Sequence, residues 1–237
     1  MVPDIESGFR LLSPSQQEEF MSLHDFRFPS ETEQSHLLTI FRSNAYNTGD
    51  DRIGLFPKTA RINHSCRPNS GNWWSGNMQR RVIYAMRDIE EGEEITVSYI
   101  PLLKSTKERQ TRLAQYGFEC DCVACAQESR EGDKRRVMIG EWLEDLEGKM
   151  GRKSKKSEVN KKRIEKAKKL AEMMEAEGLG DYVSRGYHLL AVFNQHLGNL
   201  ADAETWARKE KEVLGWAEKD SDESLASAEF VKSLKNS

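Results

Sequence analysis

The sequence predicts an α+β protein in which a strand-containing first half is followed by an all-α second half. Strand signals are confined to about residues 70–100, where aromatic and β-branched residues alternate with polar ones. From Glu131 onward no segment has a strand pattern, and helical periodicity prevails. Three of the four cysteines lie between these regions. We therefore predict three parts: residues 1–103, a cysteine-containing segment at 104–130, and a helical region at 131–237.

Two helices are predicted ahead of the strands. Ser13 is a capping residue, Pro14 occupies the first helical position, and Gln16 completes the pattern of a helix start. A second helix is predicted within residues 31–46, where apolar residues recur at helical spacing: Leu37, Leu38, Ile40, Phe41 and Ala45.

The strand region predicts a hairpin followed by one further strand. Turn signals occur at Gly76-Asn77 and at Glu91-Gly92. Between and after these turns, the residues expected to alternate along the strands are Val82, Tyr84, Ile95, Val97 and Tyr99. The next segment, residues 105–118, is predicted to be a short helix that leads into the cysteines.

The C-terminal region is predicted to be helical throughout. Two amphipathic stretches flank Gly198-Asn199, and small and aromatic residues fall where a tetratricopeptide-like (TPR-like) helical hairpin would place them: Tyr187, Ala191, Asn194, Ala203 and Ala207. A plain helical bundle explains the same pattern equally well. In either case the region is interpreted as a packing element rather than a chemical site.

A basic block lies in this region. Residues 149–169 contain eleven Lys or Arg and two Glu, a local balance of +9. A solvated helix face or loop is favoured over a nuclear-targeting or nucleic-acid-binding patch. No aromatic residues are interleaved for base stacking, so direct nucleic-acid binding is not expected.

Length and composition limit the class of protein. The chain has 237 residues, 37% of them hydrophobic and 32% charged, with a net charge of -3. This allows one large domain or two modest ones, each with its own core. No apolar run long enough to span a membrane and no signal-peptide pattern is present, so a soluble intracellular protein is expected, in the nucleus, the cytoplasm or both.

The cysteines predict a structural zinc site. Cys120, Cys122 and Cys125 form a Cys-x-Cys-x-x-Cys pattern, in which a tight turn can direct three sulfurs to one point. Only Cys66 remains to supply a fourth thiolate, and the four ligands would then use every cysteine in the chain. His64 is the rival fourth ligand, and incidental buried thiols are the plain alternative.

Three motifs in order carry a family resemblance: "NHSCRPN" at 63–69, "GEEITVSYI" at 92–100 and "YGFECDCVAC" at 116–125. Over about residues 40–125 the chain resembles the C-terminal part of a SET domain with its post-SET cysteine cluster. The spacing and the helical extension are most similar to the Smyd-like subgroup of protein-lysine methyltransferases. The resemblance implies a partial SET-domain β-fold with a zinc-bound post-SET loop.

The resemblance also implies a function. Family members transfer a methyl group from S-adenosylmethionine to a lysine amine of a protein or peptide, histones included, by direct displacement. It implies cofactor binding by Asn63 and His64, with Asn44 assisting, and packing of Phe118 on the adenine. Tyr99 would border the transfer channel, contact the cofactor and orient the amine, and Tyr116 would line the lysine channel.

The sequence also departs from the family. No Gly-x-Gly motif precedes residue 40, and the additional cysteines of the Smyd zinc-finger insertion are missing. We therefore expect a SET domain lacking its N-terminal part, with methyltransferase activity impaired by that lack. A non-catalytic, zinc-stabilised interaction module is the alternative function, and a zinc-dependent nucleic-acid binder is a third.

Overall fold

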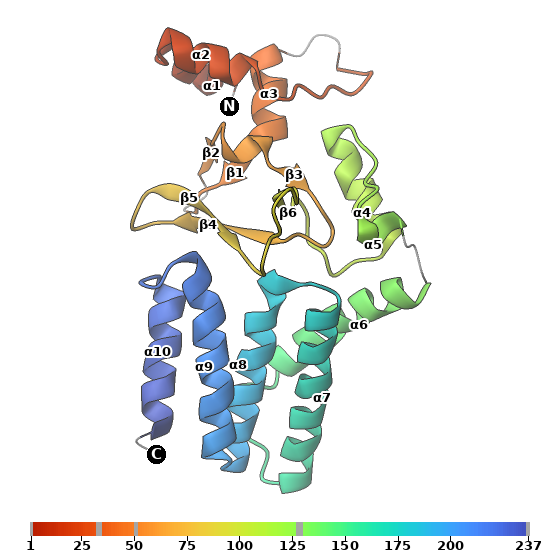
Figure 1. The fold of residues 1–237 in the computed structure, drawn as a ribbon, viewed down its shortest axis with the longest axis vertical. Coiled ribbons are helices and arrows are strands. Elements are labelled where there is room, and N and C mark those ends of the chain that lie inside the picture. Colours follow the sequence, from red (N-terminus) through yellow and green to blue (C-terminus); the bar gives the residue numbers. More distant parts are fainter. Residues whose placement is uncertain (1, 32–34, 50–51, 127–129, 236–237) are drawn as a thin grey trace.

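Strands lie between a layer of N-terminal helices and a bundle of C-terminal helices (Figure 1). This computed structural model describes residues 2–31, 35–49, 52–126 and 130–235. The N-terminal layer comprises α1 (Val2–Arg10), α2 (Pro14–Met21) and α3 (His36–Asn44). The bundle comprises α6 (Arg130–Glu147), α7 (Ser157–Ala176), α8 (Gly180–Leu197), α9 (Leu200–Ala217) and α10 (Asp222–Lys235).

Local sequence signals explain the N-terminal layer. The Ser13 hydroxyl accepts from the Gln16 N–H, and the Gln16 side chain accepts from the Ser13 N–H, so the predicted helix start is confirmed as a capping box. The second helix is confirmed as α3, although residues 32–34 of its predicted range lie outside the described residues. Helix α1 was not predicted. A small core formed around Phe20, Leu23 and Ile40 joins the three helices.

The strands form three two-stranded ladders: β1 (Ala45–Asn47) with β2 (Ile53–Leu55), β3 (Asn63–His64) with β6 (Thr96–Val97), and β4 (Ser70–Ser75) with β5 (Arg80–Ala85). The predicted hairpin is confirmed as the antiparallel β4–β5 pair, in which Trp73 lies opposite Val82. The strand predicted through Ile95, Val97 and Tyr99 is shorter than expected, because ladder pairing with β3 is limited to Thr96 and Val97.

The segment after the strands carries the cysteines. Helix α4 (Thr106–Leu113) begins with a capping box formed by Ser105 and Glu108, continues into the 3-10 helix η2 (Ala114–Tyr116), and is followed by α5 (Val123–Ala126). This arrangement confirms the predicted short helix. Another 3-10 turn, η1 (Thr59–Arg61), immediately precedes β3.

The described residues of the C-terminal region form helices joined by loops, with no strand among them, as predicted. Helices α8 and α9 meet at Gly198, whose φ of 91° suits glycine in a left-handed helix end. The basic block occupies the loop before α7 and about the first two thirds of that helix, where most side chains are exposed. The TPR-like description of these helices stays a prediction.

One hydrophobic core extends from the cysteine segment into the bundle. It includes Cys66, Leu113 and Cys120 together with Ile139, Leu170 and Phe193 of helices α6, α7 and α8. In the loop between α9 and α10, the Glu218 carboxylate accepts hydrogen bonds from Trp73 Nε1 and Ser75 Oγ of β4. The strands are thus held against the helices at two places. No described helix is long and apolar enough to cross a membrane.

Candidate active site and metal centre

A cavity of about 830 Å³ lies between the N-terminal helices, the strands and the segment before the cysteines. Its wall includes all six residues that the sequence predicted for cofactor or substrate: Asn44, Asn63, His64, Tyr99, Tyr116 and Phe118. They come from four separate segments of the chain, so only the folded chain brings them together. A cavity of this size is large enough for a nucleoside-sized ligand.

The two asparagines of the cavity wall differ in how many hydrogen bonds their side chains already make. Asn44, at the end of α3, donates both amide hydrogens to backbone oxygens, to His24 O at 2.7 Å and to Ile40 O at 2.7 Å. Only its carbonyl oxygen is left for a ligand. Asn63 is exposed and donates to Glu94 Oε1 at 2.6 Å. Its side chain can therefore reorient toward a ligand more easily than that of Asn44.

His64 lies between the cavity and the cysteines. Its Nδ1 accepts a hydrogen bond from the Tyr99 N–H at 3.0 Å, and its Nε2 lies 3.3 Å from Cys66 Sγ. Burial lowers the pKa of His64 to about 4, so the ring is neutral at physiological pH. A neutral ring with Nδ1 as acceptor carries its proton on Nε2, which then donates to the sulfur. In this arrangement His64 contacts a sulfur instead of replacing it as a metal ligand.

Three aromatic rings from two segments line one side of the cavity. The Tyr99 ring centroid lies 5.2 Å from that of Tyr116 and 6.4 Å from that of Phe118. The Tyr99 hydroxyl donates to the Ile62 carbonyl at 2.6 Å, which fixes the ring. Phe118 is 37% exposed and lines the cavity, so part of its ring is accessible to a ligand there.

Burial also sets the protonation of these phenols. It raises the pKa of Tyr99 and of Tyr116 above the ordinary value for tyrosine. Both hydroxyls are therefore protonated at neutral pH. They can donate and accept hydrogen bonds, but neither is a phenolate base.

Further residues of the wall were missed by the sequence analysis. Tyr46 of β1 and Arg81 of β5 meet in a cation–π contact, with the guanidinium carbon 4.7 Å from the ring centroid. Among the described residues Arg81 Nε has no hydrogen-bond partner. Glu94 contributes a carboxylate to the same wall. None of these three residues was singled out by a sequence pattern. Only the folded structure shows that they belong to the cavity wall.

The four cysteines converge as predicted. All four Sγ atoms, those of Cys66, Cys120, Cys122 and Cys125, lie within 4.8 Å of one another. A tetrahedral zinc with Zn–S bonds of about 2.3 Å requires S···S separations of about 3.8 Å. The Cys66 and Cys125 sulfurs are 3.6 Å apart. The cluster therefore fits a zinc ion after shifts of a few tenths of an ångström to about one ångström.

Backbone contacts hold the ligands in place. The Cys66 N–H donates to Cys122 Sγ at 3.3 Å, which links the two distant cysteine motifs directly. Gln110 of α4 accepts from the Cys120 N–H and donates to the Cys120 carbonyl. Hydrogen bonding with Cys120 and Cys122 raises the pKa of the Cys66 thiol, and a cation bound among the sulfurs would favour its thiolate form.

The first hundred residues are similar to a known protein family. Residues 9–100 match the SET domain family, so the predicted resemblance to SET-domain, Smyd-like lysine methyltransferases is confirmed. The match begins about thirty residues before the start at residue 40 that the motifs indicated, because the N-terminal helices carry no recognisable motif.

Individual relatives of the chain are named as lysine methyltransferases. Histone-lysine N-methyltransferase set5 of Schizosaccharomyces pombe is 36% identical over 141 residues, covering 57% of this chain and 43% of that protein. Histone-lysine N-methyltransferase SMYD3 of Homo sapiens is 40% identical over 82 residues, covering 34% and 19%. N-lysine methyltransferase SMYD2 of Gallus gallus is 30% identical over 132 residues, covering 51% and 30%. The chain thus matches less than half the length of these relatives.

Proposed function

We propose that this protein is an S-adenosylmethionine-dependent protein-lysine N-methyltransferase that carries a structural zinc ion. The observation that supports it most is the convergence of Asn44, Asn63, His64, Tyr99, Tyr116 and Phe118 on one cavity. Relatives that share the SET domain are named as lysine methyltransferases, which supports the same reaction class.

The cavity offers contacts suited to each part of the reactants. Asn63, His64 and the carbonyl of Asn44 would hold the polar part of the cofactor, and the exposed ring of Phe118 would stack on its adenine. S-adenosylmethionine supplies an electrophilic methyl group on a sulfonium. Aromatic faces attract a sulfonium and a methylated ammonium alike, which suits the Tyr99–Tyr116 pair.

The tyrosines would orient the attacking amine. Because the Tyr99 hydroxyl donates to the Ile62 carbonyl, its oxygen lone pairs remain free to accept a hydrogen bond from a lysine nitrogen. A lysine ammonium has no lone pair, so the amine must be neutral before it can react. An aromatic surrounding with little water lowers the pKa of a lysine and favours this neutral form.

The zinc would have a mechanical role. Bound by Cys66 and the other three cysteines, it would hold Tyr116 and Phe118, which lie just before Cys120, against His64 and Tyr99. The metal would take no part in the transfer itself. A zinc with four thiolate ligands has no open position for substrate.

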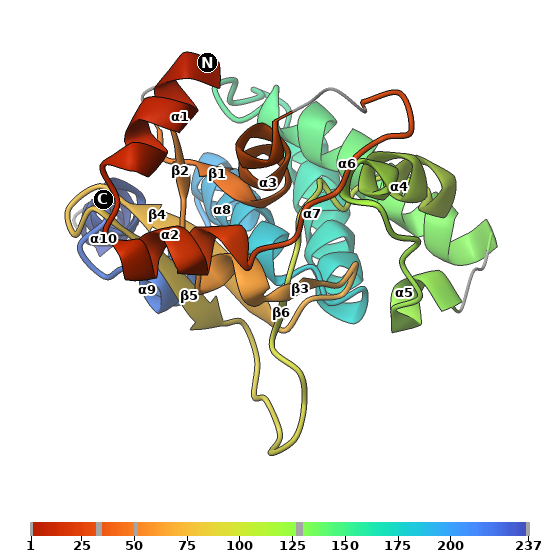
Figure 2. The ribbon, with the colours of Figure 1, turned by 90° about the horizontal axis from the view of Figure 1, so that it is seen from above.

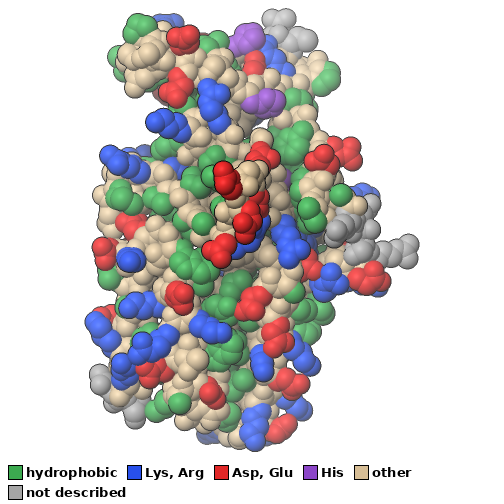
Figure 3. All heavy atoms as spheres, viewed as in Figure 1, with side chains coloured by type: hydrophobic (Ala, Val, Ile, Leu, Met, Phe, Trp, Pro, Cys, Tyr) green, Lys and Arg blue, Asp and Glu red, His purple; other side chains and the backbone are tan. Residues whose placement is uncertain are grey.

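The expected substrate is a lysine in a protein or peptide, including histone tails, in the nucleus or the cytoplasm. The loop between β5 and β6 projects from the molecule (Figure 2), and acidic side chains gather on this face in Figure 3. That loop contains Asp88, Glu90, Glu91 and Glu93, and it leads into Glu94 of the cavity wall. Its negative charge would attract a lysine-rich peptide.

Calorimetric titration with S-adenosylmethionine tests this proposal. We expect saturable binding in the unaltered protein, at least tenfold weaker binding in Asn63→Ala, and methyl transfer from labelled cofactor to a lysine peptide. Asn77→Ala is the matched control, because Asn77 lies at the hairpin turn and contacts Glu218 outside the cavity. Absence of binding at millimolar cofactor would instead favour the non-catalytic interaction module.

A further inference from the structure

Arg109 of α4 lies directly against the cysteine cluster. Its side chain is 1% exposed. Its Nε donates to Cys66 Sγ at 3.3 Å, and its Nη2 lies 3.9 Å from Cys125 Sγ. A fully buried guanidinium is costly unless it has negatively charged partners, so these contacts need a physical explanation.

The charge of the metal centre supplies that explanation. Four thiolates around a divalent cation leave a net charge of about −2 inside the hydrophobic core. The Cys66 N–H and His64 Nε2, which also donate to these sulfurs, are neutral groups. Among the described residues, no lysine and no second arginine donates a hydrogen bond to the cysteine sulfurs. Arg109 is therefore the cation that balances the thiolates at hydrogen-bonding distance.

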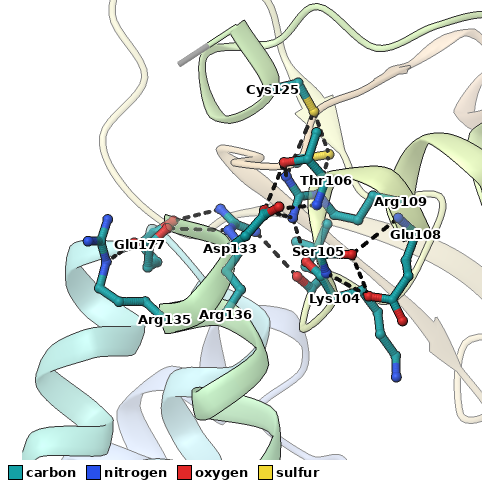
Figure 4. A network of polar contacts seen from close by, with 12 residues as sticks. Lys104, Ser105, Thr106, Glu108, Arg109, Cys125, Asp133, Arg135, Arg136 and Glu177 are labelled. Carbon is teal, nitrogen blue, oxygen red and sulfur yellow. Dashed lines mark hydrogen bonds and ion pairs between the residues drawn. The ribbon is translucent and has the colours of Figure 1, made fainter. Parts of the chain in front are cut away.

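The remaining guanidinium donors are held by fixed partners (Figure 4). Nη1 donates to the Lys104 carbonyl at 2.6 Å, and Nη2 donates to Thr106 Oγ1 at 3.0 Å. Asp133 of α6 accepts from Thr106 and lies 3.8 Å from Arg109 Nη1. These contacts orient Nε toward Cys66. The Asp133 carboxylate offsets part of the positive charge of Arg109.

A second buried arginine offers a natural comparison. Arg136 of α6 is 2% exposed, and its Nε pairs with Glu177 at 3.3 Å. It also donates to the Leu102 carbonyl, and it has no hydrogen bond to any of the four sulfurs. The two arginines share burial and the same core region, but only Arg109 contacts the metal ligands.

We propose that Arg109 is the counter-cation of the metal centre. Its hydrogen bond to Cys66 and its positive charge beside Cys125 offset the negative charge of the ligand set and thereby set how tightly the ion is held. This inference rests on the proposed zinc site and concerns metal retention rather than methyl transfer. Arg109 is a positioning residue, because it acts through the cysteines that bind the ion.

The test compares Arg109→Met with Arg136→Met in the full-length chain. Zinc affinity is measured by competition with a chromophoric chelator. We expect Arg109→Met to bind zinc about 10- to 100-fold more weakly, the usual cost of losing a residue that supports a metal ligand. Arg136→Met should stay within about threefold of the unaltered protein, even though both substitutions lower stability.

Cobalt substitution gives a second measurement that a purely structural role would not change. Loss of a charged donor to a thiolate should shift the cobalt–thiolate charge-transfer band to lower energy in Arg109→Met and leave it unchanged in Arg136→Met. If Arg109→Met does not fold, Arg109→Lys provides the same comparison. Lysine keeps the positive charge but lacks the planar guanidinium group. We therefore expect a smaller loss of zinc affinity and a smaller shift of the cobalt–thiolate band than in Arg109→Met.

Two results would overturn the proposal. One is equal zinc affinity and an unchanged cobalt spectrum in the foldable Arg109 variants. The other is an equal loss of affinity in Arg136→Met, which would make the effect one of general core stability. If the unaltered protein binds no zinc at all, the proposed zinc site itself fails, and that outcome is recognised before any variant is measured.

Discussion

The Nε2 atom of His64 lies 3.3 Å from the sulfur of Cys66, so one imidazole ring contacts the cysteine cluster while it lines the large cavity. The opposite ring nitrogen accepts from the backbone of Tyr99. The proposed metal centre and the proposed cofactor pocket are therefore joined by a single side chain.

Metal removal should weaken cofactor binding. Without zinc, the cysteine-bearing segment is no longer held against Cys66, and Phe118 and His64 lose their relative positions. We expect at least a tenfold loss of affinity for S-adenosylmethionine after dialysis against a chelator, and recovery on addition of zinc. Calorimetry before and after treatment measures this, with zinc-saturated chelator as the control. Unchanged affinity in protein shown by elemental analysis to be metal-free would contradict the coupling.

Tyr99→Phe should reduce turnover more than it reduces cofactor affinity. The substitution keeps the ring but removes the hydroxyl that contacts Ile62 and is proposed to orient the amine. We expect kcat for a lysine peptide to fall at least tenfold, and the free energy of unfolding to fall by about 1 kcal/mol. Tyr84→Phe is the control, since its hydroxyl contacts Asp181 outside the cavity. Equal effects of the two substitutions on kcat would argue against an orienting role for Tyr99.

Gly117→Ala should destabilise the protein and distort the cavity wall. Gly117 has a φ of 81°, and a Cβ there would lie 2.1 Å from Phe26 Cδ2. The left-handed conformation costs a non-glycine residue about 1–2 kcal/mol, and overpacking adds about 1–3 kcal/mol. Urea unfolding measures the difference. Gly76→Ala, where a Cβ has nothing within 4 Å, is the matched control. Equal stability of the two variants would contradict both the backbone cost and the packing cost.

The His188–Glu210 pair should make stability depend on pH. His188 Nδ1 lies 3.0 Å from Glu210, and this hydrogen bond raises the pKa of His188 above its unfolded value near 6.5. A raised folded pKa means that the contribution is fully present below pH 6.5 and is lost as pH rises through the folded pKa. Denaturant unfolding between pH 5.5 and 8.5 measures this dependence. In His188→Gln that component of the pH dependence should be absent; its persistence would assign it to another group.

Much of the secondary structure could be predicted because its signals are local. Ser13 and Gln16 mark the start of α2 whatever surrounds them, and Gly198 marks the junction of α8 and α9. The short strand β3 at Asn63–His64 had no such signal. Its two residues pair with Thr96 and Val97, more than thirty positions away, and the partner decides the conformation.

Only part of the candidate site could be predicted, because some of its residues lie in local motifs and others are placed there only by the fold. The cysteines were identified from their residue type and spacing, and Asn63 and His64 were identified through the resemblance of their motif to the SET-domain family. Arg81 and Tyr46 were missed, since each is an ordinary strand residue whose place in the cavity wall depends on the fold. The roles of Tyr99, Tyr116 and Phe118 stay predictions, although the fold brings all three to one cavity.

The sequence by itself determined the α+β class, the helical second half, the SET-domain relationship and the four candidate metal ligands. The fold class and the helical half follow from periodicity and capping residues, the candidate metal ligands follow from cysteine spacing, and the SET-domain relationship follows from the resemblance of three short motifs to that family. Only the tertiary structure decided that His64 links Cys66 to Tyr99, that Arg109 faces the sulfurs and that Arg136 does not. Such contacts depend on the distances and directions set by packing, and no local pattern in the chain encodes them.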